Sequence, residues 1–474
     1  MTATDVWVPV GLIITTIAWV AILRRWRLGL ELYILFIPFA GAVELWLYPA
    51  SWAVLIKDIL FATPAYIGFA MSGELGPALA GLPRSLGTIV LLFVGLVLVQ
   101  ALNPDGPRLL ATLVGLKVWL FYLPMILLGR AYVRDRESLL RLSRLMICLI
   151  WVPCTIGIIQ WLLSLALGYQ NAIRLFYGDA ASAATQGFAH WDSAGLMRIP
   201  ATFAFPTQYL NYILCMFVPV LGCSVIEDDR WWQRLRAVSL GLLCVAGFMT
   251  GTRGAFVMIP LMLSAFYLLR RGALGVLWVG VLMAGMIMVV LSISRIDSTG
   301  LLDMETGLTE RYVGVQASEI GDALQQTWIG RGVGINTGAA RFVADANAEL
   351  SLLEGYYAKA VVELGIAGGV VVIAVQLTLL LLALKTRAWC SGTGLMAYSD
   401  SILALVVVIL VYNYKGPYLS LDPANMLYWL FAGALFSLPK VAERQVGSQG
   451  AALTSRTNWV FEEALSGASG RVVS

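Results

Sequence analysis

The sequence predicts an all-α fold, a polytopic transmembrane helical bundle of about 12–13 spans with a helical extracytoplasmic loop. Of its 474 residues, 59% are hydrophobic and only 13% are charged, and the mean hydropathy is +0.81. One soluble core cannot bury that much apolar surface. The apolar residues form unbroken runs without alternation, and lipid offers no hydrogen bonds to backbone groups, so we expect helices and not barrel strands.

Apolar runs divide the chain into four parts. The predicted spans are residues 6–23, 28–47, 52–71, 85–102, 109–128, 146–167, 203–226, 237–250, 255–269, 273–291, 365–384, 395–414 and 424–438. We expect transmembrane helices in 1–291, an extracytoplasmic helical loop in 292–355, the C-terminal transmembrane helices in 356–440 and a disordered cytoplasmic tail in 441–474. The first run lacks a preceding basic region and a small-residue cleavage pattern, so it is expected to be a span and not a removable signal peptide.

Basic residues predict how the spans are oriented. They gather in alternate connections: Arg24, Arg25 and Arg27; residues 130–144; Arg230, Arg234 and Arg236; Arg270 and Arg271; Lys385 and Arg387; and Lys440 onward. Because Lys and Arg are retained on the cytoplasmic side, these connections are expected inside and the N-terminus outside. The two long connections, 168–202 and 292–355, then lie on the outer face, where we expect the chemistry of the protein.

The outer connection 292–355 is predicted to contain two helices. Thr309 is suited to cap the first, which places Tyr312, Gln316, Ile320 and Leu324 on one face. The glycine-rich residues 330–334 are expected to form a turn and not a nucleotide loop, because no strand precedes them and no Lys-Ser/Thr follows. A second helix is expected to begin near Asn347 and to continue to Leu384, with Leu350, Leu353, Tyr357 and Val361 on one stripe.

Arg253 is the first candidate for chemistry. It lies in Thr250-Gly251-Thr252-Arg253-Gly254, at the outer junction of two short spans, where glycines allow close approach. A cation in that place suits a phosphate. The alternative is an interfacial arginine that reaches lipid headgroups.

Further arginines make the outer face locally cationic. Arg311 lies in the outer loop, and Arg198, Arg331 and Arg341 lie in the outer connections. A pair of arginines can hold a pyrophosphate by forked hydrogen bonds and stabilise the charge that grows on it as a leaving group. The alternative for Arg311 is neutralisation by Glu310 or Glu319.

Glu354 is the candidate general base. On a continuous helix Glu363 falls on the opposite face, whereas Lys359 and Glu363 are one turn apart and can pair, so Glu354 is expected to lack a cation on its own helix. An unpaired carboxylate at the outer interface can accept a proton from a sugar hydroxyl. A solvated acid at a helix start is the alternative.

Other polar residues are weaker candidates for substrate binding. His190, the only histidine, is placed to titrate or to bind sugar in the outer connection, and Tyr357 lies beside Glu354. Lys57, Asp58 and Lys117 lie within predicted spans and are expected to cluster with Glu31 or Glu44, either as structural pairs or as a lipid-phosphate site. No metal ligand pattern is recognisable, and neither a metal nor another cofactor is expected.

The chain resembles the O-antigen ligase and polymerase superfamily of membrane glycosyltransferases. The resemblance spans most of the chain and rests on residues 57–60, 115–120, 157–160, 198–206, 251–254, 330–334 and 354–369, in that order. It implies that Arg253 and Arg311 engage pyrophosphate. One departure is that the ligases typically place a histidine nine residues before the Glu-x-Gly of the following helix, and this chain has Glu354-Gly355 there. The departure favours an exopolysaccharide or O-antigen polymerase-like member over a ligase.

The resemblance implies transfer of polyprenyl-pyrophosphate-linked glycans on the periplasmic face of a bacterial inner membrane. The expected partners are the donor, a glycan acceptor, membrane lipids and chain-length regulator or export proteins, without nucleic acid. The alternatives are an O-antigen ligase that transfers a completed glycan to another acceptor, a lipid-linked glycan flippase or transporter, and a non-catalytic subunit of an assembly complex. No internal repeat of the kind common in transporters is evident in the sequence.

Overall fold

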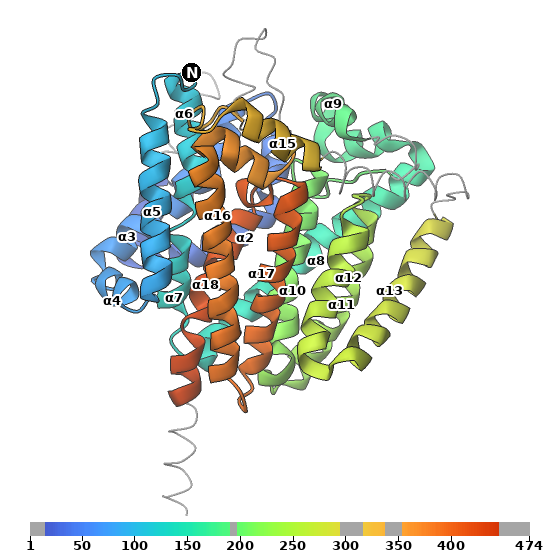
Figure 1. Ribbon diagram of the computed structural model, residues 1–474. Coiled ribbons are helices and arrows are strands. Elements are labelled where there is room, and N and C mark those ends of the chain that lie inside the picture. Colours follow the sequence, from blue (N-terminus) through green and yellow to red (C-terminus); the bar gives the residue numbers. More distant parts are fainter. Residues whose placement is uncertain (1–14, 190–196, 294–315, 337–352, 445–474) are drawn as a thin grey trace, which may run out of the picture.

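The computed structural model describes residues 15–189, 197–293, 316–336 and 353–444 (Figure 1). Its longer helices are Thr15–Arg24, α2 (Trp26–Trp46), α3 (Thr63–Met71), α4 (Leu75–Ala80), α5 (Arg84–Ala101), α6 (Leu109–Leu116), α7 (Met125–Tyr132), α8 (Arg136–Leu167), α9 (Tyr169–Ala189), α10 (Pro206–Ile226), α11 (Arg230–Met249), α12 (Ala255–Arg271), α13 (Ala273–Ile293), α15 (Gln316–Gln326), α16 (Tyr356–Trp389), α17 (Met396–Lys415) and α18 (Ala424–Leu435). The short helical segments are η1 (Ser51–Leu55), η2 (Asp58–Ala62), η3 (Lys117–Phe121) and η6 (Tyr418–Ser420). This part of the chain contains no β-strand.

The predicted all-α membrane bundle is confirmed. Within the described ranges, nine helices are long and apolar enough to cross a membrane. The helices α11, α12, α18 and Thr15–Arg24 account for the other spans that the hydropathy pattern predicts. Predicted and observed boundaries agree closely in most cases; the span predicted at 85–102, for example, is Arg84–Ala101.

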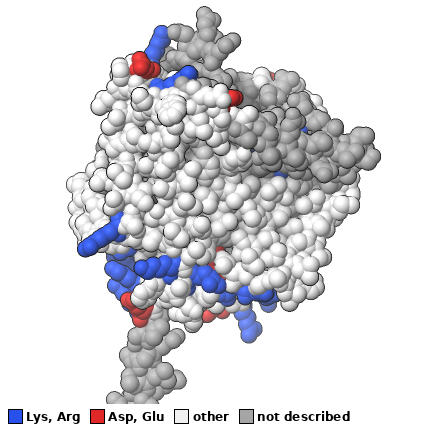
Figure 2. Space-filling view, viewed as in Figure 1, with Lys and Arg blue, Asp and Glu red and all other residues white. Residues whose placement is uncertain are grey.

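The two ends of the bundle differ in character. Helices α9 and α15 lie at one end, which we call the loop end (Figure 1). Most of the Lys and Arg on the face shown in Figure 2 lie towards the opposite end, which we call the basic end. Arg270 and Arg271 close α12 there, and Arg387 lies in the last turn of α16. The asymmetry matches the alternation of basic connections in the sequence.

Helices α10 and α17 form the centre of the bundle. Nearly every residue of α10 is buried, and α17 is buried along most of its length. By contrast, α5 and α13 expose rows of large apolar side chains, such as Leu91 and Leu92 on α5. In a membrane these outer faces meet lipid, so the polar groups that α10 and α17 enclose are shielded from it.

The predicted continuous helix from Asn347 to Leu384 is wrong in two places. Residues 353–355 are not helical and α16 begins at Tyr356; residues 347–352 lie outside the described residues. A second interruption falls at Gly365, which has φ +77° and ψ −180°. The chain from Trp328 to Arg331 fits into this break, because the Ile366 N–H donates to Trp328 O (3.1 Å) and the Arg331 N–H donates to Val362 O (2.8 Å).

The outer loop packs on the first part of α16. Ile320 of α15 contacts a small apolar cluster with Ala358, Val361 and Val362, as its predicted helical face requires. Residues 330–334 form a turn, as predicted, with positive φ at each of its three glycines. Thr309 and Tyr312, which were expected to open this helix, lie outside the described residues.

We expect Gly365→Ala to destabilise the fold. Its backbone conformation is accessible to glycine almost alone, and a β-carbon would collide with the carbonyl oxygen of Ile329. The cost should be about 2 kcal/mol or more. The melting temperature in detergent micelles would measure it, with Gly95→Ala on α5 as the control, because a β-carbon at Gly95 meets no neighbour. Equal melting temperatures for the two variants would contradict this account of the α16 break.

Candidate functional site

The connection between α17 and α18, residues 416–423, joins three polar parts of the molecule. The Tyr418 ring stacks on Tyr412 of α17, with 3.3 Å between ring centroids. Ser420 Oγ accepts a hydrogen bond from the Lys359 ammonium on α16 (3.1 Å). Asp422 Oδ2 lies 2.7 Å from Lys57 Nζ. This one short segment therefore contacts residues from opposite ends of the sequence.

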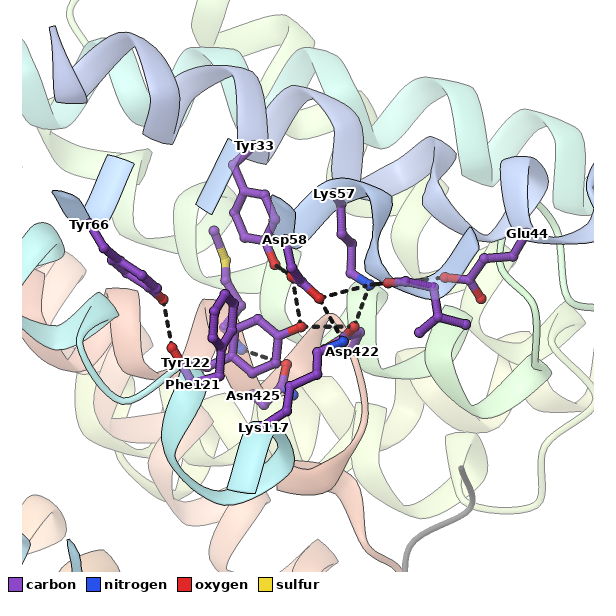
Figure 3. Close-up of polar contacts among 12 residues, drawn as sticks. Tyr33, Glu44, Lys57, Asp58, Tyr66, Lys117, Phe121, Tyr122, Asp422 and Asn425 are labelled. Carbon is purple, nitrogen blue, oxygen red and sulfur yellow. Dashed lines mark hydrogen bonds and ion pairs between the residues drawn. The ribbon is translucent and has the colours of Figure 1, made fainter. Parts of the chain in front are cut away.

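A cluster of charged side chains lies among the spans, and we call it the ion cluster. Its members are Glu44, Lys57, Asp58, Lys117 and Asp422 (Figure 3). Lys57 Nζ lies 2.7 Å from Asp422, 3.8 Å from Asp58 and 4.0 Å from Glu44. Lys117 Nζ lies 2.6 Å from Asp58 Oδ2. Two ammonium groups thus face three carboxylates, and both lysines already have anionic partners.

The sequence predicted part of this cluster. The pairing of Lys57, Asp58 and Lys117 with Glu44 is confirmed, whereas the alternative partner, Glu31, is wrong. The Glu31 carboxylate accepts from the Tyr132 hydroxyl instead (2.5 Å) and lines a cavity with Arg24 and Arg134. Asp422 was missed because it lies in a connection and not in a predicted span, and nothing in its local sequence indicates a partner several hundred residues away.

Tyrosines complete the surroundings of Asp58. Tyr33 and Tyr122 each place their hydroxyl 2.9 Å from Asp58 Oδ1, and the Tyr122 hydroxyl also lies 3.1 Å from Asp422 Oδ2 (Figure 3). These contacts bring hydroxyl donors to carboxylates that lipid cannot solvate. The result is a dense polar network inside an apolar bundle.

Two π-helical segments carry the cluster. Asp58 is the first residue of η2 and Lys117 is the first residue of η3. A π-turn adds one residue to a helix and rotates the side chains that follow it, and such turns are common at functional sites. The Tyr66 hydroxyl on α3, the helix that follows η2, donates to Phe121 O at the end of η3 (2.9 Å) (Figure 3). This hydrogen bond connects α3 to η3.

A small cavity adjoins the ion cluster. Glu44, Lys57 and Asp422 line its charged side, and Phe203 and Gln208 line the side formed by the start of α10 and the segment before it. It is too small for a sugar ring, because its free space holds about one water molecule. Ion cluster and cavity together offer a charged pocket that α2, α10 and the α17–α18 connection enclose.

We define the arginine junction as two segments that meet. Residues 197–199 precede α10, and residues 250–254 connect α11 to α12. The Ile199 N–H donates to Thr250 O (3.1 Å), and the Thr250 and Thr252 hydroxyls are 2.6 Å apart. Gly251 has φ +67°, and a β-carbon there would collide with Met197 O. The glycine thus lets two loops meet, and Arg198 and Arg253, both half-buried, belong to the same junction.

Glu354 is not the unpaired carboxylate that helical geometry predicted. Its Oε2 lies 2.6 Å from Lys415 Nζ, a cation from α17 that no argument confined to one helix could find. The expected Lys359–Glu363 pair is also replaced: Glu363 accepts from the Trp119 indole (2.6 Å) and from the N–H groups of Gly334 and Asn336. Lys359 turns to Ser420 and lies over the Trp119 ring.

The last turns of α17 bring the arginine junction and Glu354 to one place. A β-carbon on Gly254 would lie 2.6 Å from the Tyr412 hydroxyl, so the residue after Arg253 touches α17. Lys415, three residues beyond Tyr412, holds Glu354. Three helical residues advance about 4.5 Å along the axis. The two candidate groups therefore adjoin the same end of one helix.

The remaining candidate residues have different positions. The Tyr357 hydroxyl donates to Leu410 O (2.7 Å) and lies 3.3 Å from Gln376 Oε1. These contacts engage the hydroxyl in the packing of α16 on α17. Arg331 is exposed in the glycine turn, and Lys117 belongs to the ion cluster. His190, Arg311 and Arg341 lie outside the described residues.

Sequence reasoning missed Lys359, Ser420 and Lys415 as well as Asp422. Lys359 is only 2% exposed, and its nearest hydrogen-bond acceptor is the neutral Ser420 hydroxyl. A lysine in a predicted span is a signal for function, but Lys359 stands just before the predicted span and was assigned to a local ion pair. Within the described segments, no three acidic, histidine or cysteine residues form a group that could hold a metal ion.

No protein-family model matches the chain, and no curated protein matches it significantly.

We expect Lys57→Met to destabilise the protein strongly. It would leave Asp422 and Asp58 with one fewer cation in a buried place, at a cost of about 3–5 kcal/mol. The double variant K57M/D422N should recover much of that loss, because it also removes a carboxylate. Melting temperatures in detergent would measure both, with R141Q as the control, since the exposed Arg141–Glu137 pair should contribute about 1 kcal/mol or less. A double variant no more stable than K57M alone would contradict the direct pairing.

Proposed function

We propose that the chain is a membrane glycosyltransferase that joins glycan units carried on a polyprenyl pyrophosphate, at the loop end of the bundle. The observation that supports this most directly is the meeting of the arginine junction and Glu354 at the end of α17. Guanidinium groups suit a pyrophosphate, and a carboxylate suits the hydroxyl that attacks. In this proposal the loop end faces the outside of a bacterial plasma membrane.

The reaction needs no nucleotide and no metal. An acceptor hydroxyl oxygen attacks the anomeric carbon of the donor, and the bond from that carbon to the pyrophosphate oxygen breaks. The electron pair of the broken bond leaves with the pyrophosphate, and Glu354 takes the hydroxyl proton. Arg253 and Arg198, with Arg311 from the outer loop, stabilise the charge on the leaving group. Direct displacement inverts the anomeric centre.

Lys415 orients Glu354 in this scheme. Its ammonium lies 2.6 Å from Glu354 Oε2 and holds the carboxylate in one position. Glu354 is about 41% exposed, so an acceptor sugar can reach it, whereas Lys415 is largely buried. The pair therefore offers one oriented, accessible carboxylate.

In this proposal the lipid part of the donor lies along the outside of the bundle. The carrier is an apolar chain that stays in the bilayer while its pyrophosphate reaches the interface. The ion cluster is not assigned to the pyrophosphate, because Lys57 and Lys117 already have carboxylate partners.

A transporter of lipid-linked glycans is the second candidate. The ion cluster favours it, because charged groups within spans often mark a transport path and two π-segments are natural points of flexing. Glycan transfer by purified protein in liposomes without any gradient would support the enzyme. Movement of labelled donor across the bilayer without bond formation would support the transporter.

We expect Arg253→Ala to reduce polymer formation about 100-fold or more, the usual effect of removing a donor to a developing negative charge. Arg253→Lys should retain part of the activity, since charge remains and the forked geometry is lost. Polymer formed from lipid-linked repeat units by purified protein is the measurement. R174Q is the control, because Arg174 is an exposed arginine paired with Asp179 on α9. Equal activity of R253A and R174Q would remove Arg253 from the site.

Glu354→Gln and Lys415→Gln should differ in kind. If Glu354 is the base, E354Q loses turnover because an amide cannot accept the proton, while K415Q keeps part of the turnover because the carboxylate remains and only the ion pair that orients it is lost. The kcat of both variants is the measurement. A full loss in both, with lowered melting temperatures, would make the pair structural only.

In cells, the lipid-linked products that accumulate in a deletion strain separate polymerase from ligase. Single repeat units would indicate a lost polymerase, and long chains would indicate a lost ligase. Normal surface polysaccharide in that strain would contradict both.

A further inference from the structure

A second, larger and open cavity lies at the opposite end of the protein from the arginine junction. It is formed where the helix Thr15–Arg24 turns into α2, where α3 leads to α4, and where α7 leads to α8. Its charged lining consists of Arg24, Arg25, Arg27, Arg134 and Arg141 with Glu31, Glu74, Asp135 and Glu137. Positive charge thus exceeds negative charge in it by one. We call it the basic cavity.

The four carboxylates of the basic cavity are already engaged. Glu74 contacts Arg27 (2.6 Å) and Arg134 (2.8 Å). Burial raises the pKa of the Glu74 carboxyl, but hydrogen bonds from these two arginines outweigh it and hold the pKa below its usual value. Glu31 accepts from Tyr132, and Glu137 lies 3.2 Å from Arg141.

Asp135 serves the backbone. Its side chain accepts the Ser138 N–H (2.8 Å) and so caps the start of α8. That hydrogen bond from the Ser138 backbone lowers the pKa of the Asp135 carboxyl, which therefore stays ionised. None of the four carboxylates remains for the other two arginines of the cavity.

Arg24 and Arg25 are the arginines that remain. Both are exposed, and among the described residues neither has an ion pair or a side-chain hydrogen bond. Arg25 has a non-helical backbone between the two helices, φ −137° and ψ 72°, so the two consecutive arginines lie at the point where the chain turns. Two adjacent guanidinium groups at a cavity mouth match one phosphate with several oxygens.

Apolar side chains flank the same cavity. Leu28 lines it and is 36% exposed, and Met71, next to the lining residue Ser72, is 74% exposed. Leu79 on α4 is also exposed. In a bilayer such side chains meet acyl chains, so an anion that enters from the side brings its own apolar tail.

We propose that the basic cavity binds the phosphate of an anionic phospholipid headgroup through Arg24 and Arg25. The lipid is recognised by a phosphodiester charge held by the guanidinium groups and by acyl chains that lie along Leu28 and Met71. Arg27 and Arg134 are fixed by Glu74, shape the wall and together exceed its charge by one. The site lies away from the groups proposed to transfer glycans, and its occupancy holds the helix Thr15–Arg24 against α2.

Native mass spectrometry of the purified full-length protein with added phosphatidylglycerol or phosphatidylcholine of equal acyl length tests this. The wild type should bind phosphatidylglycerol more tightly, and R24Q/R25Q should weaken that binding about 30-fold, since each arginine near a charged lipid surface contributes about a factor of five. R24K/R25K should lie between the two. The control is R230Q/R234Q, which removes the same charge from exposed positions at the start of α11, outside the cavity.

Three outcomes would overturn the proposal. One is equal binding of the two lipids by the wild type, which needs no variant and so stands even if R24Q/R25Q does not fold. Another is an equal loss in R24Q/R25Q and R230Q/R234Q, which would mean diffuse surface attraction. The third is displacement of the lipid by millimolar inorganic phosphate with an equal rise in melting temperature, which would assign the cavity to a soluble phosphate.

Discussion

The ion pair between Lys57 and Asp422 is the interaction on which the geometry of the site depends. It draws the α17–α18 connection into the bundle and against Lys57 and α2, where an isolated carboxylate would be too costly to bury. With Asp422 held, Ser420 meets Lys359 and Tyr418 stacks on Tyr412. The position of the last turns of α17 thus follows from a charge pair deep in the interior.

That position in turn decides what meets at the loop end. Tyr412 contacts the glycine after Arg253, and Lys415 holds Glu354. Arg253 belongs to the α11–α12 turn, and Glu354 belongs to the segment that leads into α16. No single element carries both residues. The end of α17 is the shared surface. A change in the ion cluster therefore reaches the proposed catalytic groups through one short connection, without altering any residue that touches substrate.

The fold could be predicted almost completely from the sequence, because lipid imposes one solution on long apolar runs. Span boundaries followed from hydropathy, and the placement of Lys and Arg predicts an orientation that stays a prediction. What hydropathy could not indicate were departures from regular helix, such as the π-segments at Asp58 and Lys117 and the break at Gly365. A π-turn has no composition of its own, and a helix can contain a glycine without breaking. In this chain the break depends on residues 328–331, which fill it.

Side-chain partners were predictable only within one helix or where burial demanded a partner. The rule that charges in spans must pair found Lys57, Asp58, Lys117 and Glu44, since that rule is energetic and needs no distance. It could not find Asp422, which lies outside the predicted spans, or Lys415 beside Glu354. Helical periodicity assigned Lys359 to Glu363, but both side chains have better partners on other elements, an aromatic donor and backbone N–H groups for Glu363 and a serine hydroxyl for Lys359. In a bundle whose buried acids receive donors from other elements, spacing along one helix is the weaker constraint. The α17–α18 connection contacts Lys359, Lys57 and Tyr412 and therefore sets the geometry of the site.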